Sequence, residues 1–169
     1  MRQIVHFGLG NFARAHLLDY TADAGGGWTV IGVNLRSSTT RDGLAAQDYA
    51  YALKVQGVGV KQIAVINTIL LASEGQQPIV ETMATADIIS ATVTEKGYHL
   101  DQNGQLDVHD PVIASELNGP ALRSLIGFIA HDLARRDRPV TLLSCDNRVG
   151  NGDALRQAVQ HFAQAAQLN

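Results

Sequence analysis

The sequence has one cysteine, few basic residues and no long apolar run, and each shortage excludes a class of protein. Cys145 is the only cysteine in 169 residues, so no internal disulfide can form, which fits a reducing compartment. A net charge of −3 and a pI near 6.0 argue against a nucleic-acid partner, which would favour a basic surface. No apolar segment reaches the roughly eighteen residues that a membrane helix needs. We therefore expect neither nucleic acid nor membrane among the partners.

The N-terminus also lacks the basic-then-apolar pattern of a signal peptide, because Gly8 and Gly10 interrupt it. With the lone cysteine, this predicts a cytoplasmic protein. Hydrophobic residues make up 46% and charged residues 17% of the chain, which indicates a folded protein rather than a disordered one. The length suffices for one domain with a substantial core.

The most informative feature that is present is a glycine turn between a short apolar run and a helix-prone segment. Residues 4–7 form the apolar run, Gly8 and Gly10 the turn, and the alanine-rich segment covers 12–24. This order is typical of a dinucleotide-binding βαβ unit. Gly8 would allow the tight turn, Gly10 would let the backbone approach a pyrophosphate, and Ala13 takes the packing position. The motif is short, so an ordinary strand-turn-helix without a ligand is the alternative.

A second strand is predicted at 28–34, after three glycines that end the first helix. In a typical NAD-binding unit, an Asp or Glu closes this strand and bonds the ribose hydroxyls. Here the strand closes on Asn34, followed by Arg36 and two serines. Arg36 and the serines could accept a 2′-phosphate, which favours NADP. Alternatively, Asn34 bonds the ribose while Arg36 stacks on adenine or is solvated. NAD and NADP both stay open as the cofactor.

Strands alternate with helices along the rest of the chain. The patterns predict β-strands at 51–55 and 61–71 around a glycine turn, a helix at 78–84, a buried strand at 87–94, irregular chain at 99–118, a helix at 120–136, a strand at 139–145 and a last helix at 153–167. This alternation predicts an α/β fold: a doubly wound, mostly parallel Rossmann-like sheet with a β-hairpin-type insertion.

Four segments together resemble the mannitol dehydrogenase family, the polyol-specific long-chain dehydrogenases. They are Gly8–His16, Gly32–Ser37, Thr92–Tyr98 and Ser144–Gly152. They follow the family's order across nearly the whole chain, and the last two are far more specific than the glycine turn. The resemblance implies a metal-independent enzyme that moves a hydride between NAD(P) and a secondary alcohol carbon of a linear polyol or sugar acid.

The resemblance also implies that residues 1–169 form the NAD(P)-binding Rossmann-type domain. In the family the substrate lies between this domain and a largely helical C-terminal domain, whose lysine is the general base. Because the chain stops before that domain, we expect it to hold half of an active site and to be inactive alone. A non-catalytic dinucleotide-binding module, or a truncated remnant, is the alternative. The sequence predicts no oligomeric state.

Two groups of site residues follow. The resemblance places Asn147 beside the substrate, where an amide donor would stabilise negative charge on the reacting oxygen. Considered without the family, Asn147 is a turn residue that caps the following helix. Cofactor contacts are expected from Gly8, Gly10, Asn11, Phe12, Asn34, Arg36, Thr94 and Glu95. The six histidines have no metal-ligand spacing, and Cys145 is expected to be a buried residue at a strand end.

Overall fold

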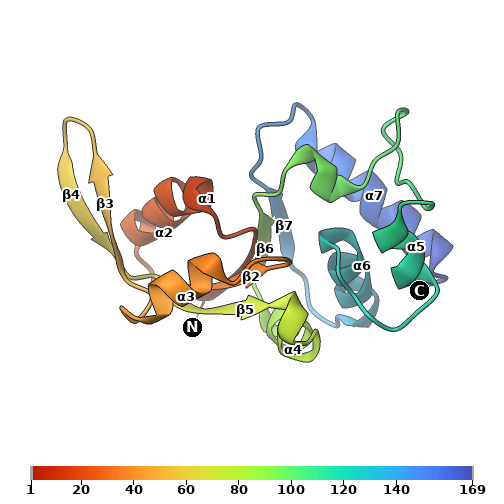
Figure 1. The fold of residues 1–169 in the computed structure, drawn as a ribbon, viewed down its shortest axis with the longest axis horizontal. Coiled ribbons are helices and arrows are strands. Elements are labelled where there is room, and N and C mark those ends of the chain that lie inside the picture. The colour runs from red at the N-terminus through yellow and green to blue at the C-terminus, as the bar shows by residue number, and fades with distance from the viewer. Residues whose placement is uncertain (1, 169) are drawn as a thin grey trace.

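Five parallel strands form the central sheet of the molecule. The structure, a computed structural model, describes residues 2–168; Met1 and Asn169, the outer bounds of the predicted domain, lie outside the described residues. The strands are β1 (Arg2–Phe7), β2 (Trp28–Asn34), β5 (Ile66–Leu71), β6 (Ile88–Ala91) and β7 (Thr141–Ser144). Their order is β5-β2-β1-β6-β7, so the chain builds outward on one side of β1 and then on the other (Figure 1). This arrangement confirms the predicted doubly wound α/β fold.

Helices cover both faces of the sheet (Figure 1). They are α1 (Asn11–Ala15), α2 (Leu17–Ala24), α3 (Thr39–Ala45), α4 (Gln77–Thr85), α5 (Pro111–Leu117), α6 (Leu125–Arg135) and α7 (Asn151–Ala165), with 3₁₀ turns η1 (Ala72–Glu74) and η2 (Glu95–Tyr98). Alternation along β1 divides the core, because successive side chains point to opposite faces. Val5 and Phe7 pack with α4, α6 and α7, whereas Ile4 packs with α1, α2 and α3.

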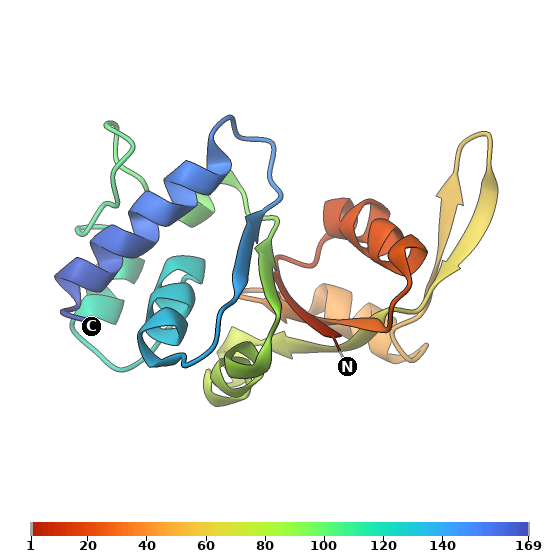
Figure 2. The ribbon, with the colours of Figure 1, turned by 180° about the vertical axis from the view of Figure 1, so that it is seen from behind.

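A separate antiparallel hairpin projects from the body, at the end opposite α7 (Figure 2). It consists of β3 (Tyr51–Val55) and β4 (Gly59–Ile63). The Tyr51 hydroxyl donates to the Arg14 carbonyl at 2.5 Å, and the Lys61 ammonium bonds Asp19 of α2 at 2.6 Å. The predicted hairpin is present, but the single strand predicted at 61–71 is wrong. The chain leaves the hairpin after Ile63 and then enters the central sheet, where β5 pairs with β2.

Several other boundaries differ from prediction: the strand predicted at 87–94 ends at Ala91, and the strand predicted at 139–145 spans Thr141–Ser144. The first helix is interrupted at His16, which has a non-helical φ of −126°. The segment predicted as irregular at 99–118 contains α5, which begins where Asp110 accepts the Val112 N–H at 2.8 Å. The helix predicted from residue 120 begins five residues later, because Ser124 caps α6 by accepting the Gly127 N–H at 2.9 Å.

Within the described residues, no helix is long and apolar enough to cross a membrane.

A buried carboxylate holds the corner between α5 and α6. Glu116 is 3% exposed and accepts hydrogen bonds from the N–H of Arg123, the N–H of Ser124 at 2.5 Å and the Ser124 hydroxyl at 2.6 Å. Negative charge at this position also suits the N-terminal end of a helix. These donors are buried away from water, and the Glu116 carboxylate supplies the acceptor that they need.

We predict that Glu116→Gln destabilises the fold by about 1–3 kcal/mol, since an amide NH₂ would face donors that need an acceptor. Urea unfolding followed by circular dichroism measures the change. Glu81→Gln, on the exposed surface of α4, serves as the control and should stay within about 0.5 kcal/mol of the parent. Equal stability of the Glu116→Gln variant and the parent would contradict this role.

Candidate functional site

A cleft of about 1010 Å³ opens at the carboxyl ends of β1, β2 and β6. Its wall comes from the turn at Gly8–Gly10, residues 34–37, residues 92–99 without 95 and 98, and residues 120–123, together with Thr40, Ala72, Ser73, Gly75, Gln76 and Val112. The chain reverses its direction across the sheet between β1 and β6, so the cleft lies at the topological switch point. Open α/β sheets bind ligands at this position.

The turn after β1 requires a glycine at its first position. Gly8 has a φ of +83°, which L side chains rarely adopt. A Cβ there would lie 2.5 Å from the Thr92 carbonyl oxygen of the segment after β6. The Gly8 N–H donates to the Val33 carbonyl at 2.9 Å, and the Gly10 N–H donates to the Gly8 carbonyl at 2.7 Å. Backbone alone therefore forms this part of the cleft floor.

A buried histidine supports the turn from below. His6 is fully buried; its Nδ1 lies 2.9 Å from Ser90 Oγ and its Nε2 lies 2.9 Å from Thr92 Oγ1. The Thr92 hydroxyl donates to the Gly8 carbonyl at 2.8 Å, so it accepts from His6 Nε2–H. Nδ1 then accepts the Ser90 proton, which requires a neutral ring. Burial lowers the pKa of His6 to about 4, against the opposite effect of the Gly8 backbone, and so keeps the ring neutral.

The end of β2 is tied to the same turn. Asn34 Oδ1 accepts the Leu9 N–H at 3.0 Å, which joins the two strand ends across the cleft floor. Arg36 follows on the cleft wall with its side chain exposed. Arg41 of α3 instead bonds Glu74 at 2.6 Å and Asp42 at 2.9 Å. The two arginines therefore differ: Arg41 is neutralised by carboxylates, and Arg36 lies along the cleft.

The segment after β6 divides its side chains between the cleft and β7. Thr94 and Lys96 line the cleft, but Glu95 does not, and it pairs with Arg148 at 2.7 Å. The Tyr98 hydroxyl lies 2.5 Å from Ser144 Oγ of β7. Burial raises the pKa of Tyr98 to about 12, with the Ser144 hydrogen bond acting in the opposite direction. Tyr98 thus stays protonated and joins η2 to β7.

The loop after β7 holds Asn147 on the surface. The residue is exposed and lies outside the cleft lining. Asn151 fixes the loop by donating to Asp146 Oδ1 at 2.9 Å and to the Ser144 carbonyl at 3.2 Å. Gly150 is the N-cap of α7, so the alternative in which Asn147 caps that helix is wrong. Its placement beside a substrate oxygen stays a prediction.

Five of the nine predicted site residues meet in the cleft: Gly8, Gly10, Asn34, Arg36 and Thr94. The other four lie outside its lining. Asn11 accepts from the Arg14 guanidinium, and Phe12 is 53% exposed and stacks on His16 with ring centroids 4.3 Å apart. Glu95 pairs with Arg148 of the loop after β7, and Asn147 lies in that loop.

Cys145 is half-buried, so the prediction of a buried cysteine is wrong in degree. Burial, with a smaller effect of Asp146, raises the pKa of the thiol, which makes it a poor nucleophile at neutral pH. Within residues 2–168, no group of three His, Cys, Asp or Glu side chains could hold a metal ion.

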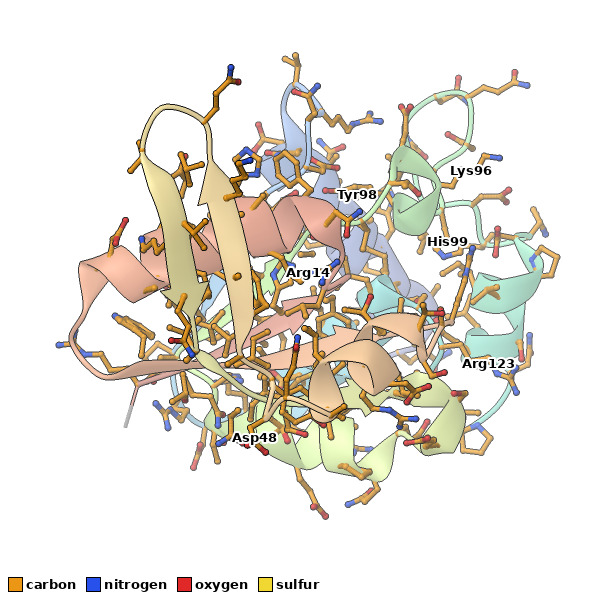
Figure 3. The ribbon with its side chains drawn as sticks, turned by 60° about the vertical axis from the view of Figure 1, so that its left-hand side comes forward. Arg14, Asp48, Lys96, Tyr98, His99 and Arg123 are labelled. Carbon is orange, nitrogen blue, oxygen red and sulfur yellow. The ribbon has the colours of Figure 1, made fainter. Side chains whose placement is uncertain are left out.

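Sequence reasoning missed two cleft residues, His99 and Arg123. His99 has a φ of +51° and its Nδ1 lies 3.1 Å from Asp110 Oδ2. Arg123 follows the polar segment before α6, where no periodic pattern marks a site. Figure 3 shows Lys96, His99 and Arg123 on the same side of the structure, contributed by η2, the residue after it and the segment before α6. The positive φ of His99 is the kind of signal that only the structure provides.

A family model described as the mannitol dehydrogenase Rossmann domain matches residues 2–169. Mannitol 2-dehydrogenase of Pyrenophora tritici-repentis is 36% identical over 185 residues, which cover 98% of this chain and 32% of the relative. Mannitol 2-dehydrogenase of Cereibacter sphaeroides is 35% identical over 178 residues, covering 95% of this chain and 37% of the relative.

Two solved structures share the fold. A substrate-free D-sorbitol dehydrogenase has a TM-score of 0.90 and 28% identity, covering 96% of this chain and 38% of that protein. Pseudomonas fluorescens mannitol 2-dehydrogenase, solved as a ternary complex with NAD and D-mannitol, has a TM-score of 0.88 and 35% identity, covering 98% of this chain and 37% of that protein. The chain thus spans about a third of the length of the relatives it matches.

The depressed pKa of His6 predicts that acid weakens the fold. The folded pKa is about 4 and the ordinary value 6.5, so the native state binds fewer protons than the unfolded state between these values. Stability is therefore full above pH 6.5 and falls as the pH drops toward 4. Between pH 7 and 4.5 the loss from this group is about 2 kcal/mol.

Urea unfolding of the parent and of His6→Gln over that pH range tests the prediction, because the glutamine does not titrate. The difference in unfolding free energy between pH 7 and 4.5 should be smaller in His6→Gln by about 2 kcal/mol. His109→Gln, an exposed histidine, should keep the parent's slope. An identical slope in all three proteins would show that His6 does not titrate as described.

Proposed function

We propose, because this chain belongs to the mannitol dehydrogenase family, that it forms the dinucleotide-binding part of an oxidoreductase that acts on a polyol or sugar acid. One observation carries the proposal. The glycine turn, which has no room for a Cβ at Gly8, opens into the cleft of about 1010 Å³ at the switch point of a parallel sheet. A cradle of this kind suits a phosphate-bridged ligand that must approach backbone closely.

The residues present suit a nicotinamide dinucleotide. In this proposal the pyrophosphate lies over Gly8 and Gly10, where no side chain intervenes, and the adenosine lies toward Asn34 and Arg36. The nicotinamide lies toward the segment after β6, near Thr94. When bound, the nicotinamide would accept a hydride from the alcohol carbon of the substrate, or return it to the ketone. NAD or NADP is the cofactor class.

The protein's own residues would hold and shape this site rather than perform the proton transfer. His6, Thr92 and Ser90 keep the turn in place, as the hydrogen bonds among them indicate. Asn147, in the loop after β7, would donate its amide to the substrate oxygen, where negative charge develops during oxidation. That role is carried over from the family resemblance.

The substrate class rests on the relatives. The matched proteins are named for mannitol and D-sorbitol, which are linear hexitols, and we extend that class to this chain together with the related sugar acids. The relatives are about three times as long, and the family resemblance implies that the general base lies in a second domain outside this chain. We propose that residues 1–169 bind the dinucleotide but do not turn over a polyol alone.

NADH should bind this chain saturably, and Gly10→Val should weaken binding at least tenfold. A Cβ at Gly10 has room, since its nearest neighbour is the Gly8 carbonyl oxygen at 3.8 Å, so the variant is expected to fold. The valine side chain would then occupy the floor that the pyrophosphate needs. Isothermal titration calorimetry measures both affinities.

Gly152→Val is the matched control, because a Cβ there meets nothing within 4 Å and the residue lies outside the cleft. It should bind NADH as the parent does. A folded parent that binds neither NADH nor NADPH, or a Gly10→Val variant that binds as tightly as the parent, would reject the proposed site.

A further inference from the structure

The cleft has a charge opposite to that of the whole chain. The chain carries a net charge of −3, yet the cleft wall holds Arg36, Lys96, Arg123 and His99 and, among the described residues, no Asp or Glu. Arg36, Lys96 and Arg123 form no ion pair with any residue in the range 2–168. Three available cations without a carboxylate favour a ligand with more than one negative charge.

The end of β2 lacks the group that selects an unphosphorylated ribose. In sites that prefer NAD, a carboxylate at this position accepts from the ribose hydroxyls, and its charge repels a 2′-phosphate. Here the residue is Asn34, and its Oδ1 is engaged by the Leu9 N–H at 3.0 Å. The oxygen of the amide is therefore engaged, its other polar group is an NH₂ donor, and the side chain carries no negative charge. Both the attraction for the hydroxyls and the repulsion of phosphate are missing.

The residues just beyond Asn34 supply donors instead. Arg36 and Ser37 follow on the cleft wall and are exposed, and Thr40 of α3 lines the same wall. The neighbouring Arg41 cannot take their place, because Glu74 and Asp42 hold its guanidinium. An arginine with two hydroxyl residues on the same cleft wall is a donor set that suits a phosphate monoester.

We infer that this cleft takes a dinucleotide phosphorylated on the adenosine 2′-hydroxyl, and that Arg36 is the residue that selects it. The inference rests on the proposed function, because it assumes that a dinucleotide occupies the cleft. In this arrangement Arg36 contacts the 2′-phosphate, with Ser37 and Thr40 as hydroxyl donors. Lys96 and Arg123 line the same cleft and add positive potential there. NADPH is therefore bound more tightly than NADH.

Calorimetric titration of the full chain with NADPH and with NADH tests the inference. The parent should bind NADPH at least tenfold more tightly than NADH, since a charge-assisted contact with phosphate is strong. Arg36→Ala should weaken NADPH binding about tenfold or more and change NADH binding less than about threefold. Arg156→Ala, which removes an equal charge from the exposed surface of α7, should change neither.

A second variant reverses the selection without removing a structural bond. Asn34→Asp keeps an oxygen that accepts the Leu9 N–H and adds the missing carboxylate. We expect it to weaken NADPH binding at least tenfold while NADH binds as well as before or better. Circular dichroism of each variant establishes that it is folded before its affinities are compared.

The outcomes separate the inference from the function on which it rests. The inference is supported if the parent prefers NADPH and if Arg36→Ala and Asn34→Asp each remove that preference. NADH bound as tightly as NADPH, or equal losses for both cofactors in Arg36→Ala, overturns the inference and leaves the proposed function intact. A folded parent that binds neither cofactor overturns both.

Discussion

The site depends on one close approach, between the turn after β1 and the segment after β6. Gly8 lies so near the Thr92 carbonyl oxygen that a Cβ would come within 2.5 Å of it. The same two residues are joined by a hydrogen bond of 2.8 Å from the Thr92 hydroxyl to the Gly8 carbonyl. His6 locks that hydroxyl in place from the buried side. Because Gly8 has no side chain, the ends of β1 and β6 approach closely, and only backbone lines this part of the cleft floor.

Charge then determines what this floor can accept. The described cleft residues include arginine and lysine but no carboxylate, and the Asn34 side chain is engaged in supporting the turn. Two acidic residues near the cleft form ion pairs with arginines that do not line it: Glu74 with Arg41, and Glu95 with Arg148. An acidic chain with a basic cleft suits a negatively charged ligand, since the surrounding charge does not reach the site strongly through solvent.

The sequence predicts what depends on local patterns and misses what depends on distant partners. The strand at 28–34 and the turn at Gly8 follow from local preferences, of β-branched residues for strands and of glycine for positive φ, and the observed β2 has the predicted bounds. The run at 61–71 has no breaking residue, so its division between hairpin and sheet becomes visible only when β5 pairs with β2. His6 meets Ser90 across 84 residues of sequence, beyond any local pattern. Arg123 could not be predicted either, since it reaches the cleft only through the packing of α5 and α6.

Amide hydrogen exchange measured with and without saturating NADPH tests the central claim, that a dinucleotide lies across the turn after β1, most directly. We expect slower exchange at residues 8–12, 34–37 and 92–97, where the ligand would cover backbone, and unchanged exchange in the hairpin at 51–63. Protection confined to other segments, or no change at 8–12 with ligand bound, would contradict it.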